Sequence, residues 1–547
     1  YIYPGTGERI DQPDLYKNYP LLESAASIPE ILQYPNGRTV TIQDSNSTLQ
    51  TALSDVIYEP VLFPAAKIAR FTNRSKIDPV QSIMNCQPKY GHNHWDCLNI
   101  SLFANGVELL PDIGYTHTYN RRWAASTLAH NTVTVDGQES LRNPHGGNYI
   151  RFVPGNSFVN IVRATDSSCY DQTSIYDRET IMVPTGDIES SRYVLDIFRV
   201  KGGNRHEYSL NFCADYDTVT SMWPQHTGEE ETMLPYGVPF LKPKEELYQG
   251  EASGHYHGYM YVEDVKTLEL KNQPYSMVCT ITQEPHQGKG VHVYGDHTEG
   301  KLFLGKAPSL RLTRQSYILD HNDTTDQYQM DKLVLRREGA DLESVFLHVF
   351  EAFEKDQPQK IYSVERLYPI GCSSLDVVTK VTGEGFVDYV FSAYHDDLFV
   401  SIDGIDFKGQ FGALKIQHGK AVIAQAVSGK LCFKGAVLIE TKRTTGNVLS
   451  ALSKGRNDAV NGFMIDSILS KNVNDQFMVV YHPDQTTHAY RIKGSFLEDG
   501  KTIVDLGDME PGFIIDKNRS SKMTHFPFIQ WNGSTTIIID ENGGVSY

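Results

Sequence analysis

The stretch Cys97–Leu110, CLNISLFANGVELL, decides the fold class of this chain. Apolar and polar residues alternate from Leu98 to Leu102, which is the period-two pattern of a strand with one buried face. The run then reaches Asn105-Gly106, a dipeptide that accepts the positive φ angles of a type I′ turn. A second apolar run, VELL, follows the turn. The stretch therefore predicts a β-hairpin and an antiparallel architecture around it.

The same turn chemistry recurs outside this stretch. NTVTVDGQES, residues 131–140, places Asp136-Gly137 after another alternating run and predicts a second hairpin. Later runs such as YVLDIFRV, ESVFLHVFEAF, AVIAQAV and TTIIIDENGG have the composition of further strands. The helical period is weak after about residue 70. We therefore predict a mainly β chain built from large antiparallel β-sandwich domains.

Residues 1–68 have a different pattern. DLYKNYPLLESAASIPEILQY, residues 14–34, spaces its apolar residues at mixed helical intervals, and prolines interrupt it. This predicts short helices and loops that bury too little apolar surface to form a core alone. We expect three parts: residues 1–68, a central β-sandwich over 69–395, and a C-terminal β domain over 396–547.

The length and charge of the chain restrict its function. A chain of 547 residues is too long for one ordinary core, so more than one domain is expected. The formal net charge is −17, which argues against nucleic acid and anionic membranes as partners. It does not exclude an acidic polymer if basic residues gather locally in a cleft. No apolar run reaches the roughly 18 residues that a membrane span needs.

The seven cysteines are scattered singly along the chain, with no CxxC pair. This spacing argues against a disulfide framework and against a thiolate zinc site. The chain also lacks the GxSxG, Walker and dinucleotide-binding glycine patterns. A nucleotide-dependent or serine-hydrolase mechanism is therefore not indicated.

Three islands of polar residues, HNHWD, LPDIGY and LAHNTV, lie near one another in the sequence. They contain His94, Asp112 and His130, which together offer nitrogen, oxygen and nitrogen ligands. That set suits zinc, with a water in the fourth position. The alternative is that each residue is an ordinary polar side chain at a strand end. The spacing alone does not decide between the two interpretations.

A straight hairpin would keep two of these residues apart. If Asn105-Gly106 forms a two-residue turn, Asn99 faces Asp112. His94 then lies five residues further along, or about 16 Å on an extended strand. A shared ion therefore requires the HNHWD segment to bend back, or the second strand to be diverted.

Basic and aromatic residues gather in THTYNRRWAAST, between the second and third islands. This segment carries Tyr119, Arg121 and Arg122. Guanidinium groups bind carboxylates and sulfates bidentately, and aromatic rings stack on sugar faces. The alternative is a surface loop whose arginines pair with nearby acids.

Four other histidines are weaker candidates. His145, in a Gly-rich loop close after the third island, could line a cleft, whereas a structural role is favoured for His206. His255 and His257 have the HxH spacing of residues on one strand face, so a metal pair is geometrically possible. An exposed loop is the favoured interpretation of that pair.

HxHxD, LLPDIGY and STLAHNTVTVDGQ together resemble the start of the β-sandwich domain of heparinase II/III-like polysaccharide lyases, over about residues 60–140. PNGRTVTIQDS, residues 35–45, resembles the segment that closes the helical toroid of that superfamily. Residues 344–367 resemble a later strand pair of the sandwich. The resemblance implies an (α/α) toroid followed by antiparallel sheets, with the active cleft between them. Residues 1–68 are then the remnant of that toroid, and its other part, with its catalytic tyrosine, is expected upstream of Tyr1.

The resemblance also implies β-elimination at a uronic acid. Such an enzyme neutralises the C5 carboxylate, removes the C5 proton and protonates the leaving O4, which gives a 4,5-unsaturated product. The acidic composition favours alginate as the polysaccharide, and a glycosaminoglycan such as heparin or heparan sulfate is the alternative. A non-catalytic carbohydrate-binding β-sandwich protein is the alternative from a different class. The expected location is secreted or periplasmic in a bacterium.

The roles that the resemblance implies fall into three groups. The catalytic residues are His92, which faces the substrate, and Tyr119. The substrate-binding residues are Tyr115, Arg121 and Arg122. The ligands of a structural zinc are His94, Asp112 and His130. Asp96 and Asn131 are expected to orient the histidines.

Overall fold

The computed structural model describes residues 17, 22, 25–45 and 59–547, apart from gaps at 74–78, 89–90, 142, 155–157, 187–189, 239–255, 312–321, 358, 396–397, 470–472 and 526. Antiparallel strands dominate it, so the prediction of a mainly β chain is confirmed. In the N-terminal part, the described residues include one short helix, α3 (Ile28–Ile31). Much of the predicted toroid remnant lies outside the described residues, and β1 occupies part of its end. No described helix is long and apolar enough to cross a membrane.

A five-stranded antiparallel sheet forms the first layer, in the order β1-β2-β3-β4-β5. Its strands are β1 (Val61–Phe63), β2 (Ile68–Thr72), β3 (Gln81–Asn85), β4 (Asn99–Ala104) and β5 (Val107–Leu110). Along the chain, the helix α4 (Arg121–Ala125) and the 3₁₀ turn η1 (Thr127–Ala129) follow this sheet and precede the first strand of the next one.

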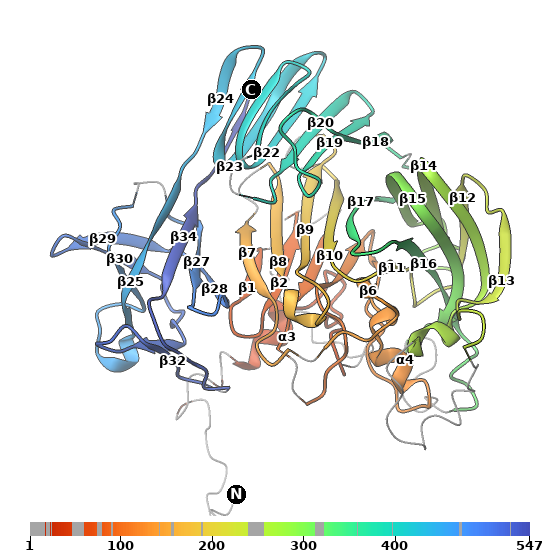
Figure 1. The fold of residues 1–547 in the computed structure, drawn as a ribbon, viewed down its shortest axis with the longest axis horizontal. Helices are drawn as coiled ribbons and strands as arrows, with labels where there is room; N and C mark the ends of the chain where they lie inside the picture. Colours follow the sequence, from red (N-terminus) through yellow and green to blue (C-terminus); the bar gives the residue numbers. More distant parts are fainter. Residues whose placement is uncertain are drawn as a thin grey trace, which may run out of the picture.

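A twelve-stranded sheet forms the central layer (Figure 1). Its strands are β6 (Val133–Val135), β7 (Asn148–Val153), β8 (Asn160–Thr165), β9 (Ile175–Pro184), β10 (Arg192–Lys201), β11 (Arg205–Asn211), β12 (Thr218–Trp223), β13 (Gly228–Thr232), β14 (Glu263–Ile281), β15 (Gly290–Pro308), β16 (Gln329–Glu338) and β17 (Glu343–Phe353). The 3₁₀ turns η2 (Ser167–Cys169) and η3 (His257–Tyr261) lie in its connections.

An eight-stranded sheet forms the third layer, and the C-terminal strand returns to it (Figure 1). Its strands are β18 (Ile361–Leu367), β19 (Val377–Gly383), β20 (Phe386–Ser392), β21 (Leu398–Ile402), β22 (Ile405–Gln417), β23 (Lys420–Phe433), β24 (Ala436–Glu440) and β35 (Asn542–Ser546).

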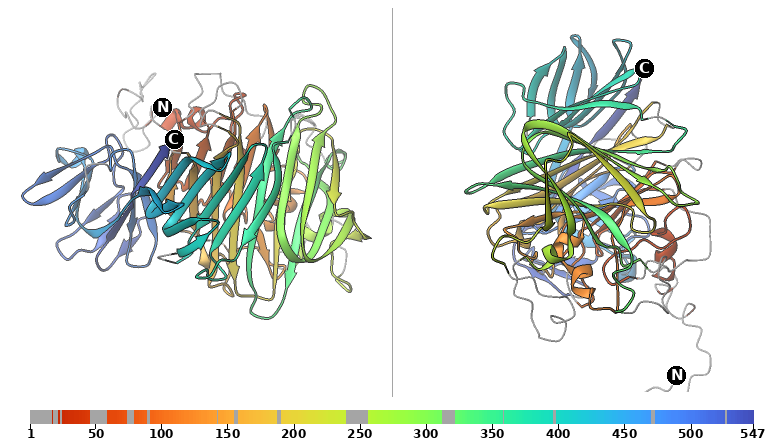
Figure 2. Two further views of the ribbon diagram at one scale, coloured as in Figure 1. Left: turned by 90° about the horizontal axis from the view of Figure 1, so that it is seen from above. Right: turned by 90° about the vertical axis from the view of Figure 1, so that its right-hand side faces the viewer.

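A separate module of shorter strands lies beside these layers (Figure 2). Its seven-stranded sheet contains β25 (Arg443–Leu452), β26 (Gly462–Ile465), β27 (Phe477–Tyr481), β28 (Thr487–Arg491), β29 (Gly494–Glu498), β30 (Lys501–Asp505) and β34 (Thr536–Asp540). A three-stranded sheet adds β31 (Phe513–Ile515), β32 (Ser521–Met523) and β33 (Gln530–Trp531), and η5 (Lys454–Arg456) follows β25.

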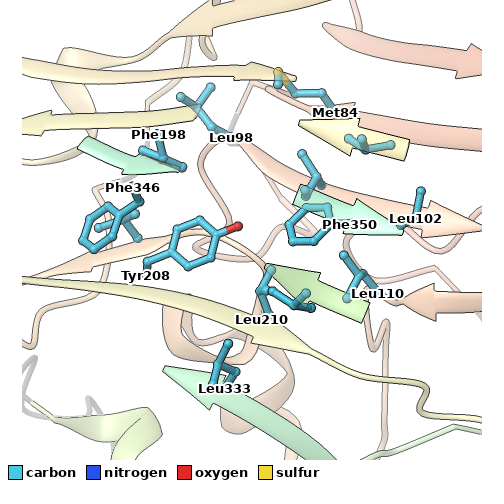
Figure 3. Packing of buried hydrophobic residues seen from close by; sticks show 14 of the residues in the cluster. Met84, Leu98, Leu102, Leu110, Phe198, Tyr208, Leu210, Leu333, Phe346 and Phe350 are labelled. Carbon is cyan, nitrogen blue, oxygen red and sulfur yellow. The ribbon is translucent and has the colours of Figure 1, made fainter. Parts of the chain in front are cut away.

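Strand β10 of the central sheet is buried on both faces, which explains its nearly continuous apolar run YVLDIFRV. Val194 and Phe198 belong to the core against the five-stranded sheet. Tyr193 and Leu195 point to the opposite core, which contains residues of β18 to β23. Figure 3 shows the first core, where Leu102 lies among side chains of the central sheet.

Both predicted tight turns are present, but the second hairpin is reduced to a single bridge. Asn105 and Gly106 have φ angles of 55° and 81°, and β4 and β5 pair across them as predicted. Asp136 and Gly137 also have positive φ angles. Across the second turn Val135 forms a single antiparallel bridge with Gln138, whereas β6 as a whole pairs with β11. Local turn chemistry fixed the reversal, whereas a distant strand supplied the partner.

The predicted boundaries at 68/69 and 395/396 do not coincide with the divisions between sheets. β1, which precedes residue 68, already belongs to the first sheet. The eight-stranded sheet begins at β18 and continues through β24, so residue 395 lies inside it. The change of sheet falls near residue 360, and another follows β24. Because similar alternating patterns occur on either side of residue 395, the sequence alone does not show where one sheet ends and the next begins.

Candidate active site and metal centre

The three predicted metal ligands lie together. The ligand atoms of His94, Asp112 and His130 are all within 4.8 Å of one another, and all three residues are buried. Nδ1 of His94 lies 3.2 Å from Nε2 of His130, and that Nε2 lies 3.8 Å from Oδ1 of Asp112. Two nitrogens bound tetrahedrally to one zinc ion are separated by roughly 3.3 Å. The cluster therefore has the spacing of a metal centre.

The HNHWD segment bends back, as a shared site requires. The backbone amide of Trp95 donates to the carbonyl of Ala125 at 2.9 Å, which ties the segment to the end of α4. Leu98 has a φ of 54°, which reverses the chain before β4. Asn99, at the start of that strand, donates to Oδ2 of Asp112 at 2.9 Å. The strand pair and the bend together bring His94 to Asp112.

Hydrogen bonds orient the two histidines of the cluster. Nδ1 of His130 lies 2.8 Å from the carbonyl oxygen of Ser126, which only accepts, so this nitrogen donates and Nε2 keeps its lone pair. Nε2 of His94 lies 3.1 Å from Oδ1 of Asp44, so the Nδ1 lone pair of His94 points into the cluster. Two acceptor nitrogens beside a carboxylate form the donor set of a divalent cation such as zinc.

Asp44 joins the buried cluster to an exposed one. Its Oδ2 lies 2.9 Å from Nδ1 of His92 and 3.3 Å from a terminal nitrogen of Arg121. Burial alone would raise the pKa of Asp44. Hydrogen bonds from His94 and His92 and the charge of Arg121 outweigh burial and lower this pKa below its usual value, so the carboxylate stays ionised. No sequence pattern singles out Asp44, although it lies in the segment PNGRTVTIQDS. Only the tertiary contacts reveal its role.

His92, Arg121 and Tyr115 form an open surface beside Asp44. The side chain of His92 is 86% exposed, and Nδ1 is bound to Asp44, which leaves Nε2 available to a ligand. The guanidinium of Arg121 lies 4.9 Å from the centroid of the Tyr115 ring and 3.4 Å from its hydroxyl. His117 lies 3.1 Å from the same hydroxyl. This surface combines a basic group, an aromatic ring and a histidine, which suits an acidic sugar.

Two other predicted site residues occupy different surroundings. Tyr119 is 3% exposed, and its hydroxyl donates to Asp326, whose other oxygen accepts from Asn120. Burial and Asp326 raise the pKa of Tyr119 above its usual value. Arg122 is partly exposed within α4. The catalytic role of Tyr119 and the substrate-binding role of Arg122 therefore stay predictions.

Asp96 and Asn131, which were expected to orient the histidines, hydrogen-bond to the surroundings of the candidate ligands rather than to the imidazole rings. Asp96 accepts hydrogen bonds from Gln43 and Asn85, and the carbonyl oxygen of the Gln43 side chain accepts the backbone amide of His94. The side chain of Asn131, next to His130, donates to the carbonyl of Ile100 at 2.8 Å. These bonds hold the backbone at two of the three candidate ligands.

A buried ion pair holds the backbone next to the metal cluster. Arg178 and Asp196 are bidentate, at 2.8 and 2.7 Å, and both side chains are fully buried. Arg178 also donates to the carbonyls of Leu98 and Asn131. The pair thus fixes the chain on both sides of the metal cluster.

Replacing Arg178 by Met is expected to lower the free energy of unfolding by about 3–5 kcal/mol, because it leaves Asp196 as an uncompensated buried charge. Urea denaturation measures the loss. The double variant Arg178→Met/Asp196→Leu is the matched control, and it should recover much of the lost stability. A single variant as stable as the parent protein would contradict this view of the pair.

The remaining histidine candidates are resolved in part. His206 is buried, with its ring nitrogens 2.9 Å from Ser344 Oγ and 2.7 Å from the Gly202 carbonyl, which gives it the expected structural role. His145 is partly exposed, and its backbone amide donates to Asn143. His255 and the side chain of His257 lie outside the described residues, so their pairing stays a hypothesis.

Comparison with known proteins relates part of this chain to a known family. Residues 58–206 match the family model described as Heparinase II/III-like, C-terminal. The resemblance stated from the sequence is therefore confirmed for this superfamily.

Two curated relatives are alginate lyases by name. An alginate lyase from Stenotrophomonas maltophilia is 27% identical over 169 residues, which is 28% of this chain and 22% of that protein. An exo-oligoalginate lyase from Saccharophagus degradans is 26% identical over 145 residues, which is 23% of this chain and 19% of that protein. The matched region thus spans about a fifth of each relative.

Solved structures give more distant matches. The crystal structure of a heparan sulfate lyase from Pedobacter heparinus has a TM-score of 0.43 and 13% identity, covering 70% of this chain and 54% of that one. A structure titled Heparinase III has a TM-score of 0.43 and 15% identity, covering 69% of this chain and 54% of that one.

Proposed function

We propose that this chain is part of a secreted or periplasmic polysaccharide lyase that cleaves a uronate-containing polysaccharide by β-elimination. The observation that carries the proposal is the exposed pair of His92 and Arg121, which share Asp44 with the buried cluster that includes His94. The superfamily match over residues 58–206 supports the reaction class. Alginate is the favoured polymer, because both curated relatives are named for it.

The geometry suggests a role for each exposed group. Arg121 would bind the C5 carboxylate and offset its charge, because a neutralised carboxylate tolerates the extra charge of the enolate. His92 would move a proton at Nε2, either from C5 or to the leaving O4. Asp44 would hold the proton on Nδ1 of His92 and so fix the reactive tautomer. Tyr115 would stack against the sugar beside Arg121.

We further propose that His94, Asp112 and His130 hold a structural zinc ion. Zinc would join the HNHWD segment, the end of the first hairpin and the loop after η1, which are otherwise separate in sequence. An ion there also accounts for two acceptor nitrogens facing each other at 3.2 Å. In this account zinc maintains the shape of the site, and the exposed residues perform the reaction.

The proposed reaction is tested by ultraviolet absorbance, since elimination creates a double bond conjugated with the carboxylate. The full-length gene product is mixed separately with alginate, heparan sulfate, hyaluronan and chondroitin sulfate. The expected result is an increase with alginate. An increase with a sulfated polymer instead would reassign the substrate. No increase with any polymer would contradict the lyase and favour a carbohydrate-binding protein.

Replacing Asp44 by Asn is expected to lower both kcat and metal affinity by about tenfold to a hundredfold. Asparagine keeps one acceptor oxygen, so it can accept from His92 or from His94 but not from both. Steady-state kinetics and metal analysis of the dialysed protein measure the two effects. Asp44→Glu, which keeps both oxygens, should retain more of each property. Unchanged kinetics and metal content in Asp44→Asn would remove Asp44 from the site.

A further inference from the structure

A second candidate binding site lies where the edge of β15 changes partner. One edge of β15 pairs with β14 along most of its length. The other edge pairs with β17 over Gly290–Gly295 and with β16 over Lys301–Pro308. The strand therefore passes from one neighbour to the other between residues 296 and 300, where β16 and β17 diverge. A groove of about 580 Å³ lies at this fork, within the size range of ligand pockets.

Two arginines of this groove share one nearby carboxylate, that of Asp296, which interacts with both through space. In the described part of the chain, no ion pair is formed by the guanidinium of Arg337 or of Arg366. Arg337 donates to Thr298 at 2.5 Å, its Nε is buried without a hydrogen-bond partner, and its guanidinium lies 4.7 Å from the Phe346 ring centroid. Burial and the neighbouring Arg366 lower the pKa of Arg337 to about 10. In a chain of net charge −17, two adjacent guanidiniums that share a single carboxylate indicate a site for an anionic group.

An exposed aromatic ring adjoins these arginines. Arg366 lies 5.0 Å from the centroid of the Tyr368 ring, and Tyr368 is 67% exposed. The guanidinium of Arg366 also donates to the carbonyls of Ser374 and Asp376, which hold it in place. A ring fixed at the mouth of a polar groove offers a flat apolar surface, which a sugar ring can cover.

The carboxylates of the groove restrict the kind of ligand that it can bind. Glu338 pairs with Arg205, and the carboxylate of Asp296 accepts the backbone amide of Arg366 at 3.1 Å. Glu269 and Glu299 lie exposed at the rim. They would repel a densely charged polymer but can accept hydrogen bonds from hydroxyl groups. Arginines for a carboxylate, acids for hydroxyls and an aromatic face together match an acidic sugar better than an inorganic anion.

We propose that the groove lined by Arg337, Arg366 and Tyr368 is a second binding site for a uronate unit of an acidic saccharide, separate from the surface around His92. The identity of the saccharide rests on the proposed function, whereas the anion site itself does not. Such a site would hold the polymer on the protein without taking part in the reaction.

The test is calorimetric titration of the His92→Ala variant with a saturated alginate trisaccharide, so that no substrate is consumed. Two binding sites per chain are expected. Adding Arg366→Ala or Tyr368→Ala should weaken binding at one of them roughly tenfold or more and leave the other unchanged. Tyr362→Ala is the matched control, because Tyr362 lies on β18 together with Arg366, is 65% exposed and does not line the groove. It should retain both sites.

The outcomes separate this inference from the proposed function. A single site that Tyr368→Ala removes would support the groove even if the surface around His92 binds nothing. Unchanged stoichiometry and affinity in both Arg366→Ala and Tyr368→Ala would overturn the inference. Tight binding of sulfate without binding of the trisaccharide would also overturn it, because the groove would then take inorganic anions. Thermal unfolding of each variant confirms that the fold is retained.

Discussion

The His92→Ala variant is expected to lose at least about a hundredfold in kcat/KM on the uronate polymer, while the fold and the metal content remain unchanged. Positioned proton transfer contributes roughly a hundredfold to ten-thousandfold to enzymatic rates. The side chain of His92 is 86% exposed and is absent from the buried cluster, so its removal leaves no cavity. Steady-state assays, metal analysis and thermal unfolding of the same preparation measure the three properties.

His226→Ala is the matched control for this prediction. His226 is another partly exposed histidine, and its side chain lies near Glu229 rather than Asp44. This control should keep full activity. A His92→Ala protein that cleaves the polymer as fast as the control would show that His92 is not the catalytic histidine.

The His94→Ala variant is expected to lose the metal ion, and its free energy of unfolding is expected to fall by about 2–4 kcal/mol. His94 is 1% exposed, so its removal deletes a buried side chain as well as a candidate ligand. Elemental analysis of the dialysed protein and urea denaturation measure the two losses. Activity should decline as well, because Asp44 loses its hydrogen bond with His94, which helps to hold it beside His92.

His206→Ala separates metal loss from simple destabilisation. His206 is equally buried and hydrogen bonded, but it lies outside the three-residue cluster. This control should lose stability and retain one metal ion per chain. If His94→Ala also retained a full complement of metal, the three-residue centre would be wrong.

Local sequence signals predicted the parts of the fold that depend on few residues. Asn105-Gly106 fixed the hairpin because the preference for positive φ is a property of those two residues. The partner of β6 was not predictable in this way, because β11 lies about seventy residues further along the chain. The pattern of YVLDIFRV indicated a strand, but only the structure shows that sheets cover both of its faces.

The candidate site was likewise predictable only in part. His94, Asp112 and His130 followed from a sequence resemblance, and the structure brings them together. Asp44 was missed because a lone aspartate in a loop has no periodic signal, and its contacts depend on a chain reversal some fifty residues away. The groove at Arg337 was missed because it arises where a strand changes partner, and strand pairing is not visible in one sequence.

The most direct test of the central claim is the mass of the products from a saturated alginate oligosaccharide. Elimination adds no water, so the masses of the two fragments should sum to the mass of the substrate, and one fragment should carry the 4,5 double bond. Mass spectrometry of the reaction with the full-length gene product measures this sum. The lyase account predicts equality. Fragments whose masses exceed the substrate by one water would show hydrolysis, and an intact substrate would show no cleavage; either result would contradict the account.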